Sequence, residues 1–252
     1  MRTILVVLFL FFYFLFSIPV LGIEYLLAKK HKRAVDLHRL HSVQWALRMI
    51  MFFSGTKMVV KGHENVPTDE PVLYIGNHRS FFDIITTYSI CPDLTGYIAK
   101  DSLNKVPILG WIMRRAYCLF LVRDDPKQSI RVIQTATEYV KQGVSISIYP
   151  EGGRNRDDGR EDSLLPFKDG SFKIAARTGC PIVPMATIGS ADVLEKHFPW
   201  IHSRTVTVIY GKPVRLQELE KEVQKKPGAY FRGLVQELIA EEYREREQSG
   251  RG

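Results

Sequence analysis

The sequence predicts an α/β protein in which a largely parallel or mixed central sheet is flanked by helices and preceded by an N-terminal membrane-associated helical segment. Two observations predict this fold. After residue 56, short β-rich runs alternate with helical runs, which is typical of a mainly parallel sheet. Before residue 24, the chain is almost entirely apolar, which is typical of a membrane segment. We therefore divide the chain into membrane-anchoring helices at 1–55 and an α/β domain at 56–252.

The first segment is an uncharged apolar run from Ile4 to Ile23. As a helix it would be about 30 Å long, which matches the hydrocarbon thickness of a bilayer. A cleaved signal peptide is the alternative, but the run is long for one and no A-x-A site ends it. The basic stretch KKHKR at 29–33 favours a cytosolic position for the downstream chain, so we expect attachment to the cytoplasmic face of a membrane. Pro19 and Gly22 leave a kinked or re-entrant segment open.

The next stretch, at 34–53, carries apolar residues at helical spacing with arginines between them. Two interpretations fit this pattern. The stretch is either an amphipathic helix in the membrane interface or a helix that packs against the α/β domain. The Ser54-Gly55 pair marks the predicted end of this helix.

The α/β domain contains seven predicted strands, each a short apolar run between turn signals. Several of these runs lack polar alternation, as expected for strands that are covered on both faces. The predicted strands are 58–60, 71–76, 96–99, 117–122, 144–149, 182–188 and 205–211. The clearest helix begins after Asp125 as its N-cap, with Pro126 in its first position and Gly143 beyond its end. Further helices are predicted at about 172–177 and 228–246.

Composition narrows the classes of function. The 252 residues carry a net charge of +8, which indicates an anionic partner. The three cysteines are scattered and include no C-x-x-C spacing, so they indicate reduced thiols and neither a disulfide framework nor a zinc site. Nucleic-acid binding would explain the charge alone, and no recognition motif supports it.

The stretch IGNHRSFFD places His78 five residues before Asp83. The same spacing separates His31 from Asp36, so spacing alone does not identify an acid–base pair. Five residues of one continuous helix leave side chains roughly 140° apart, so we expect His31 and Asp36, in a stretch without Gly or Pro, to point apart. A bend between the preceding strand and a helix capped by Ser80 instead lets His78 fold back toward Asp83. The plainer interpretation is a helix-capping aspartate and an ordinary loop histidine.

The second polar stretch, YPEGGRNR, also follows an apolar strand, where ligand crevices form in α/β sheets. Gly152 and Gly153 let a ligand approach the backbone closely, and Arg154 offers a planar fork that suits phosphate. Glu151 precedes the glycines, and Lys168 lies downstream in LLPFKDGSF. The plainer interpretation is a polar turn with solvated charges.

Together, these stretches resemble the glycerolipid acyltransferase family, most closely the 1-acylglycerol-3-phosphate acyltransferases. NHRSFFD is similar to the N-H-x-x-x-x-D signature, and YPEGGR to the E-G-x-R signature with Gly153 in place of the usual Thr. YCLFLVR resembles the G-x-x-F-x-x-R block through Phe120 and Arg123, although Tyr117 stands where Gly is usual. IAKDSLNKVPILGW resembles the segment that carries a family lysine, here Lys100, and CPIVPMA resembles the late proline block.

The resemblance implies a mechanism. His78 would act as general base on the free hydroxyl of the acceptor, and Asp83 would orient the imidazole. The reaction would acylate 1-acylglycerol-3-phosphate (lysophosphatidic acid) at sn-2 and form phosphatidic acid at the membrane lipid bilayer. The acyl donor would be acyl-CoA or acyl carrier protein (acyl-ACP), with no tightly bound cofactor and no metal. Backbone N–H groups near Ser80 would stabilise the developing oxyanion.

The resemblance also implies a phosphate site. Arg154 and Lys100 would hold the phosphate of the acceptor, with Arg123 and Lys168 as further candidates. Glu151 would hydrogen-bond the glycerol or order the arginines.

Three alternatives remain beside this interpretation. The acceptor could be glycerol-3-phosphate or another lysolipid. In a different class, a noncatalytic membrane lipid-binding protein would explain the anchor and the charge, but it would not explain two polar motifs at strand ends. A hydrolase is disfavoured because the sequence contains neither G-x-S-x-G nor H-E-x-x-H.

Overall fold

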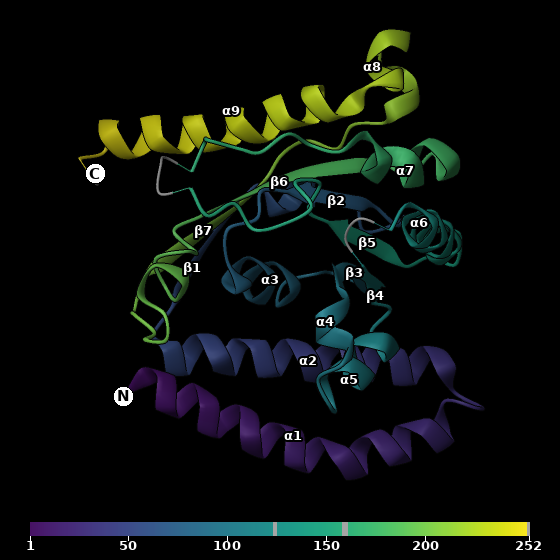
Figure 1. The fold of residues 1–252 in the computed structure, drawn as a ribbon, viewed down its shortest axis with the longest axis vertical. Coiled ribbons are helices and arrows are strands. Elements are labelled where there is room, and N and C mark those ends of the chain that lie inside the picture. The colour runs from purple at the N-terminus through teal and green to yellow at the C-terminus, as the bar shows by residue number, and fades with distance from the viewer. Residues whose placement is uncertain (123–124, 158–160, 251–252) are drawn as a thin grey trace.

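The computed structural model describes residues 1–122, 125–157 and 161–250. Within them, a seven-stranded sheet has the strand order β1-β7-β6-β2-β5-β3-β4 (Figure 1). Its strands are β1 (Lys57–Lys61), β2 (Leu73–Gly76), β3 (Thr95–Lys100), β4 (Leu119–Leu121), β5 (Ser145–Ile148), β6 (Ile182–Ile188) and β7 (Thr205–Tyr210). Each of them overlaps a predicted strand. Among these strands only β6 and β7 pair antiparallel, so the predicted largely parallel or mixed sheet is confirmed.

Helices cover both faces of the sheet (Figure 1). They are α1 (Arg2–Leu27), α2 (Lys32–Ser54), α3 (Phe81–Tyr88), α4 (Asp101–Asn104), α5 (Leu109–Arg115), α6 (Pro126–Lys141), α7 (Lys173–Thr178), α8 (Lys221–Lys225) and α9 (Pro227–Gln248). Short 3₁₀ turns are η1 (His63–Asn65), η2 (Asp169–Phe172), η3 (Glu195–His197) and η4 (Leu216–Glu218). The predicted N-cap of α6 is confirmed, because the Asp125 side chain accepts a hydrogen bond from Gln128 N.

Two apolar layers hold the sheet between its helices. On one face, Phe231 and Val235 of α9 and Ala136 of α6 belong to one buried cluster with the sheet. On the opposite face, Leu40 of α2 and Tyr88 of α3 belong to a second cluster that is rich in tyrosines. The central strands are therefore covered on both sides, which explains why their sequences lack polar alternation.

α1 and α2 form an antiparallel hairpin under the domain (Figure 1). The chain between them turns at 28–31, so His31 is the N-cap of α2 and the assumption of one continuous helix through His31 is wrong. His31 and Asp36 nevertheless share no hydrogen bond in the described part of the chain, because Asp36 pairs with Arg39 at 3.0 Å. α2 ends at Ser54, as predicted, and Gly55 follows in the left-handed conformation with φ +69°.

The packing decides between the two interpretations of α2 in favour of a helix packed on the domain. Leu40 is buried in the cluster beneath the sheet, and the Gln44 side chain donates hydrogen bonds to the carbonyls of Tyr88 and Cys91. α2 still leaves Trp45 and Phe52 exposed. The hairpin therefore shares one face with the domain and presents apolar side chains elsewhere.

α1 is the one helix among the described residues that is long and apolar enough to cross a membrane, by length and composition. Both of its ends are tied to the rest of the protein. At the N-terminal end, Thr3 Oγ1 donates to Pro199 O and accepts from Ile201 N. At the C-terminal end, buried Glu24 pairs with Arg39 of α2 at 2.9 Å. The helix consequently lies along α2, and its N-terminal end also contacts the domain.

Candidate active site

The sheet topology brings three polar segments to one edge. β2 lies between β5 and β6 and runs parallel to both, so the chain leaves all three strands at the same edge of the sheet. His78 follows β2, Glu151 follows β5, and Glu195 follows β6. The two motifs that are 73 residues apart in sequence are in direct contact there.

His78 and Asp83 form a hydrogen-bonded pair, with His78 Nδ1 2.9 Å from Asp83 Oδ2. The expected strand–bend–helix geometry makes this possible, because β2 ends at Gly76 and α3 begins after Ser80 with the predicted capping box. Asp83 is fully buried, and its Oδ2 also accepts from the backbone N–H groups of Arg79 and Ser80. These contacts place the carboxylate at the positive end of α3.

The contact with Asp83 determines which nitrogen of the neutral imidazole carries the proton. A carboxylate accepts hydrogen bonds, so Nδ1 of His78 carries a proton and donates it to Asp83. In the neutral imidazole, Nε2 is then the nitrogen without a proton. The side chain of His78 is 15% exposed, so this nitrogen is partly shielded from water but not sealed off. An imidazole in this state can accept a proton from a hydroxyl group.

A stacked tyrosine and two backbone bonds hold His78 in place. The His78 ring lies on the Tyr149 ring, with centroids 4.3 Å apart and an interplanar angle of 13°. Burial raises the pKa of Tyr149 well above its ordinary value, so the phenol remains neutral. The backbone N–H of His78 donates to Glu151 Oε1 at 2.8 Å, and its carbonyl accepts from Asn155 N at 2.7 Å.

Glu151 acts as a link between backbone segments. One carboxylate oxygen accepts from His78 N and the other accepts from Leu165 N at 2.9 Å. Burial raises the pKa of the Glu151 carboxyl, and the two backbone N–H groups oppose that rise. In this structure both oxygens of Glu151 therefore make contacts that position His78, and the expected contact with the glycerol or the arginines stays a prediction.

We expect Glu151→Gln to lower kcat roughly tenfold with little change in KM, because an amide nitrogen would face one of these N–H groups and shift His78. A buried donor left without an acceptor costs about 1–3 kcal/mol, so the melting temperature should also fall. Glu138→Gln is the matched control, because Glu138 forms an exposed pair with Lys141. Wild-type kcat and melting temperature in Glu151→Gln would contradict the positioning role.

The backbone donors proposed for an oxyanion are already occupied. At the start of α3, the N–H groups of Arg79 and Ser80 donate to Asp83, and Phe81 N donates to Glu195 Oε1 at 2.8 Å. Phe82 N donates to the Ser80 hydroxyl. In this structure these groups hold protein carboxylates and a hydroxyl, so the expectation that they face an oxyanion is not met.

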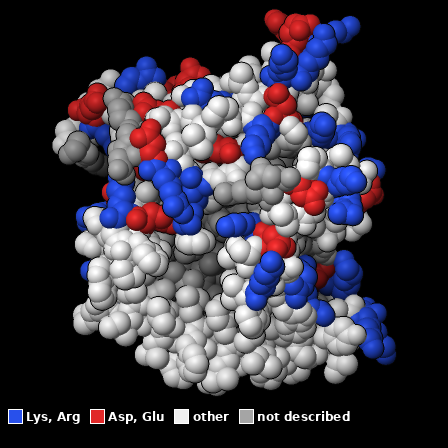
Figure 2. Space-filling model, viewed as in Figure 1, with Lys and Arg blue, Asp and Glu red and all other residues white. Residues whose placement is uncertain are grey.

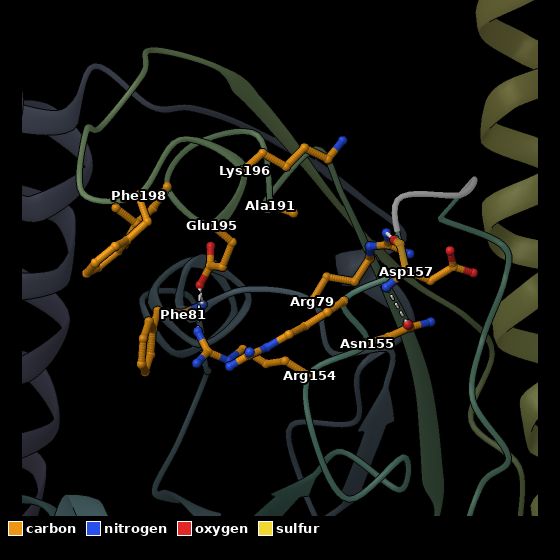
Figure 3. A pocket seen from close by; sticks show the side chains of 11 residues that line it. Arg79, Phe81, Arg154, Asn155, Asp157, Ala191, Glu195, Lys196 and Phe198 are labelled. Atoms are coloured by element: carbon orange, nitrogen blue, oxygen red, sulfur yellow. Dashed lines mark hydrogen bonds and ion pairs between the residues drawn. The ribbon is translucent and has the colours of Figure 1, made fainter.

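Arg154 enters a cavity of about 430 Å³ beside α3 (Figure 3). Its guanidinium lies 4.2 Å from the centroid of the Phe81 ring and pairs with Glu195 at 2.9 Å. The cavity is lined by Arg79, Phe81, Arg154, Asn155, Arg156, Asp157, Ala191, Leu194, Glu195, Lys196 and Phe198. Four of these side chains are basic and two are acidic, so the lining favours an anionic ligand.

The other predicted residues lie at the glycine turn, at the end of β3, or outside the described residues. Gly152 has φ +73°, and a Cβ there would lie 2.8 Å from Lys168 Nζ, so the lysine lies over the glycine turn. Gly153 completes that turn between Gly152 and Arg154. Lys100 ends β3 on the same side of the sheet, but it is not among the residues that line the cavity. Arg123 lies outside the described residues.

Comparison with known proteins agrees with these motifs. A sequence model of the family described as Acyltransferase matches residues 57–188, which is more than half of the chain and includes both motifs. The chain belongs to this acyltransferase family. The region that holds Glu195 and Phe198 lies just beyond the match.

Relatives and a solved structure support the assignment of the acyltransferase fold and family. A 1-acyl-sn-glycerol-3-phosphate acyltransferase of Salmonella typhimurium is 30% identical over 71% of this chain and 72% of its own length. A chloroplastic 1-acyl-sn-glycerol-3-phosphate acyltransferase of Brassica napus is 35% identical over 75% of this chain and 53% of its own length. The chain thus spans about half the length of that plant relative.

The crystal structure of the 1-acyl-sn-glycerophosphate acyltransferase PlsC from Thermotoga maritima has the same fold. It superposes with a TM-score of 0.73, at 24% identity, over 96% of this chain and 98% of the other. The shared part includes the N-terminal hairpin of the acyltransferase, since the comparison covers nearly the whole of both chains.

Sequence reasoning missed Glu195 and Phe81 as members of the site. In the sequence Phe81 is only the residue after the N-cap serine of a predicted helix, and Glu195 lies in a segment without a motif. One signal could have identified Glu195. It follows β6, which runs parallel to β2, so it leaves the sheet at the same edge as His78. Among the described residues of this acyltransferase, no group of three or more His, Cys, Asp or Glu could hold a metal ion.

Proposed function

We propose that this protein transfers an acyl chain from an acyl thioester to the free sn-2 hydroxyl of 1-acylglycerol-3-phosphate and forms phosphatidic acid. The observation that carries the proposal is the oriented His78–Asp83 pair, 2.9 Å apart, beside a cavity with a basic lining. The pair suits the deprotonation of a hydroxyl group. The lining suits an acceptor that carries phosphate.

The chemistry needs no nucleophilic side chain, because the attacking hydroxyl belongs to the acceptor. Nε2 of His78 takes the hydroxyl proton as the oxygen attacks the thioester carbonyl carbon, and a C–O bond forms. The C–S bond then breaks, and the leaving thiolate of CoA or acyl carrier protein takes the proton from the imidazolium. Asp83 stabilises that imidazolium through the Nδ1–H bond.

The phosphate of the acceptor would bind at the glycine–arginine turn. Arg154 supplies a planar fork, and Lys168 lies over Gly152 at the same turn. Glu195 already holds the Arg154 guanidinium, so phosphate binding would share or replace that carboxylate. Lys100, at the end of β3, and Arg123 remain proposed contributors.

We expect Arg154→Ala to raise the KM for a phosphate-bearing lysolipid, because a desolvated arginine–phosphate contact is worth about 1.5–3 kcal/mol, or roughly ten- to a hundredfold. Arg154→Lys should recover only part of the affinity, since the planar fork is lost. Steady-state kinetics with the acceptor varied provide the measurement. Arg131→Ala, at an exposed position on α6, is the control. An unchanged KM in Arg154→Ala would remove Arg154 from the site.

We also propose that residues 1–55 hold the α/β domain of 56–252 on the cytoplasmic face of a membrane. The outer side of α1 exposes apolar residues along most of its length. Thr3 binds the domain, and Glu24, near the other end of α1, binds α2, which packs on the domain, so the helix is held beside the domain and is suited to lie in one leaflet. The basic residues at the hairpin turn add attraction to anionic lipid.

The direct test of the catalytic proposal is the release of free thiol from an acyl-CoA. Purified protein should release CoA in step with added lysophosphatidic acid and release little without it. A noncatalytic lipid-binding protein would bind the lysolipid and release no thiol in either case. Thiol release that is independent of acceptor would indicate a thioester hydrolase.

A further inference from the structure

The loop at 197–201, which is part of the connection between β6 and β7, exposes two large aromatic side chains. Phe198 is 77% exposed and Trp200 is 58% exposed. Most large apolar side chains of the α/β domain are buried instead, and the nearby Val193 is fully buried. Exposed aromatic residues of this size at one loop mark a contact surface.

The loop is continuous with the apolar surface of α1. Thr3 binds Pro199 O and Ile201 N, so the start of α1 is joined to the loop from both sides of Trp200. The first turns of α1 add exposed apolar residues next to this junction, namely Ile4, Val7, Leu8 and Phe11. In Figure 1 the loop reaches down beside the start of α1 and the end of α2.

The same loop borders the candidate active site. Phe198 lines the cavity that holds Arg154, together with Phe81, which is 42% exposed. Figure 3 shows Phe198 and Phe81 on one side of Glu195, with Asp157 on the other side. One end of the cavity is thus aromatic and lies toward the hairpin, while the other end is polar.

Basic residues flank the aromatic loop. Arg2, Lys196 and Arg204 are exposed around it, and only Lys196 forms an ion pair in the described part of the chain, with Asp192 at 2.9 Å. Figure 2 shows that the lower left of the molecule, where this loop and the hairpin lie, is mostly free of charge, with both basic and acidic groups at its upper border. Apolar aromatics bordered by Lys and Arg match the interface of an anionic bilayer.

We propose that residues 197–201 form a second lipid-contacting element, in which Phe198 and Trp200 enter the interfacial layer of the bilayer beside α1. This contact brings the aromatic end of the cavity to the lipid surface. A lysolipid can then place its acyl chain among the bilayer lipids while its headgroup reaches Arg154. The proposal rests on the proposed membrane attachment through residues 1–55.

Tryptophan fluorescence tests the contact without reference to catalysis. The chain contains three tryptophans, so Trp45→Phe combined with Trp111→Phe leaves Trp200 as the reporter, and Trp111→Phe with Trp200→Phe leaves Trp45. Each form is added to vesicles of phosphatidylcholine and phosphatidylglycerol in which a fraction of the lipids is brominated in the upper acyl chain. We expect a blue shift and quenching of Trp200 and of Trp45.

The paired reporters separate two kinds of failure. If Trp45 is quenched and Trp200 keeps the spectrum of the protein in buffer, the loop proposal is overturned while the anchor stands. If neither is quenched, membrane attachment by the hairpin fails as well. If Trp200 is insensitive to lipid but shifts as the protein dimerises with concentration, the loop is an interface between copies of this chain.

A kinetic test uses Trp200, which does not line the cavity. Trp200→Ser should raise the apparent KM for vesicle-borne lysolipid about three- to tenfold and leave transfer to a monomeric short-chain lysolipid unchanged. Trp200→Phe should restore most of the loss. Tyr230→Ser, at an exposed aromatic on α9 on the opposite side of the sheet, is the control and should have no effect. An equal loss of transfer to both acceptors would overturn the proposal.

Discussion

We expect His78→Ala to reduce kcat by about 10²- to 10⁴-fold, which would remove nearly all measurable acyl transfer, because the general base of the acceptor hydroxyl is lost. The fold is expected to survive, since Asp83 keeps its bonds to Arg79 N and Ser80 N. The ring stack on Tyr149 is lost at a cost of about 0.5–1.5 kcal/mol. The measurements are kcat with saturating acceptor and the thermal unfolding midpoint.

His31→Ala is the matched control for this prediction. His31 has the same five-residue spacing to an aspartate, but it is an exposed N-cap without a side-chain capping bond. Its removal should leave kcat within about twofold of wild type, as for most surface substitutions. If His31→Ala were as damaging as His78→Ala, the geometric distinction between the two pairs would be wrong.

Asp83→Asn is expected to cost about 10²- to 10⁴-fold in kcat, as the corresponding change does in catalytic triads. His78 Nδ1, Arg79 N and Ser80 N all bond the same oxygen of Asp83, so the amide oxygen of asparagine can still accept from them. The neutral amide, however, lacks the negative charge that stabilises the imidazolium formed during the reaction. The affinity for the lysolipid should change little. Kinetics at several pH values together with a binding measurement separate this effect from simple damage to the helix cap.

The loss of folding stability in Asp83→Asn can be compared with that of a second capping variant. An asparagine still accepts hydrogen bonds at the start of α3, so the stability loss should be about 1 kcal/mol. Ser80→Ala, which removes the other half of the capping box, should destabilise the protein by a similar amount. Greater unfolding in Asp83→Asn than in Ser80→Ala, with activity tracking the folded fraction, would assign Asp83 to structure alone.

Much of the fold could be predicted because local signals agreed with the tertiary structure. The predicted strand at 182–188 matches β6 residue for residue, and the signals around Asp125 and Pro126 place the start of α6. The pairing of His78 with Asp83 was also accessible, since a strand end and an N-cap serine define the bend between them. Each of these features depends on residues that are close in sequence.

The parts that sequence reasoning missed depend on contacts between distant segments. Glu195 meets Ser80 and Phe81 across more than 110 residues, and the N-terminus meets the loop at 197–201 across more than 190 residues. Separate helical segments are predicted before residue 24 and at 34–53, but the turn at 28–31 between them contains no Gly or Pro, so the sequence does not mark its position. Instead, packing of both helices and the pair of Glu24 with Arg39 stabilise the hairpin.

Glu151 shows how the sequence context of one residue can suggest a role that differs from the contacts it makes in the structure. Its sequence context, beside two glycines and an arginine, indicates contact with a ligand. In the structure both of its oxygens bind backbone N–H groups from segments on either side of the site. A carboxylate that is buried in this way positions other residues, and only the tertiary structure distinguishes the two roles.

The most direct test of the central claim is the mass of the product formed from a panel of acceptors. Purified protein with one acyl-CoA is given lysophosphatidic acid, glycerol-3-phosphate and lysophosphatidylcholine in separate reactions, with His78→Ala in parallel. The account predicts phosphatidic acid from lysophosphatidic acid, little acylated product from the other two acceptors, and none with His78→Ala. Preferential acylation of glycerol-3-phosphate or lysophosphatidylcholine, or no acylated product from any acceptor, would contradict it.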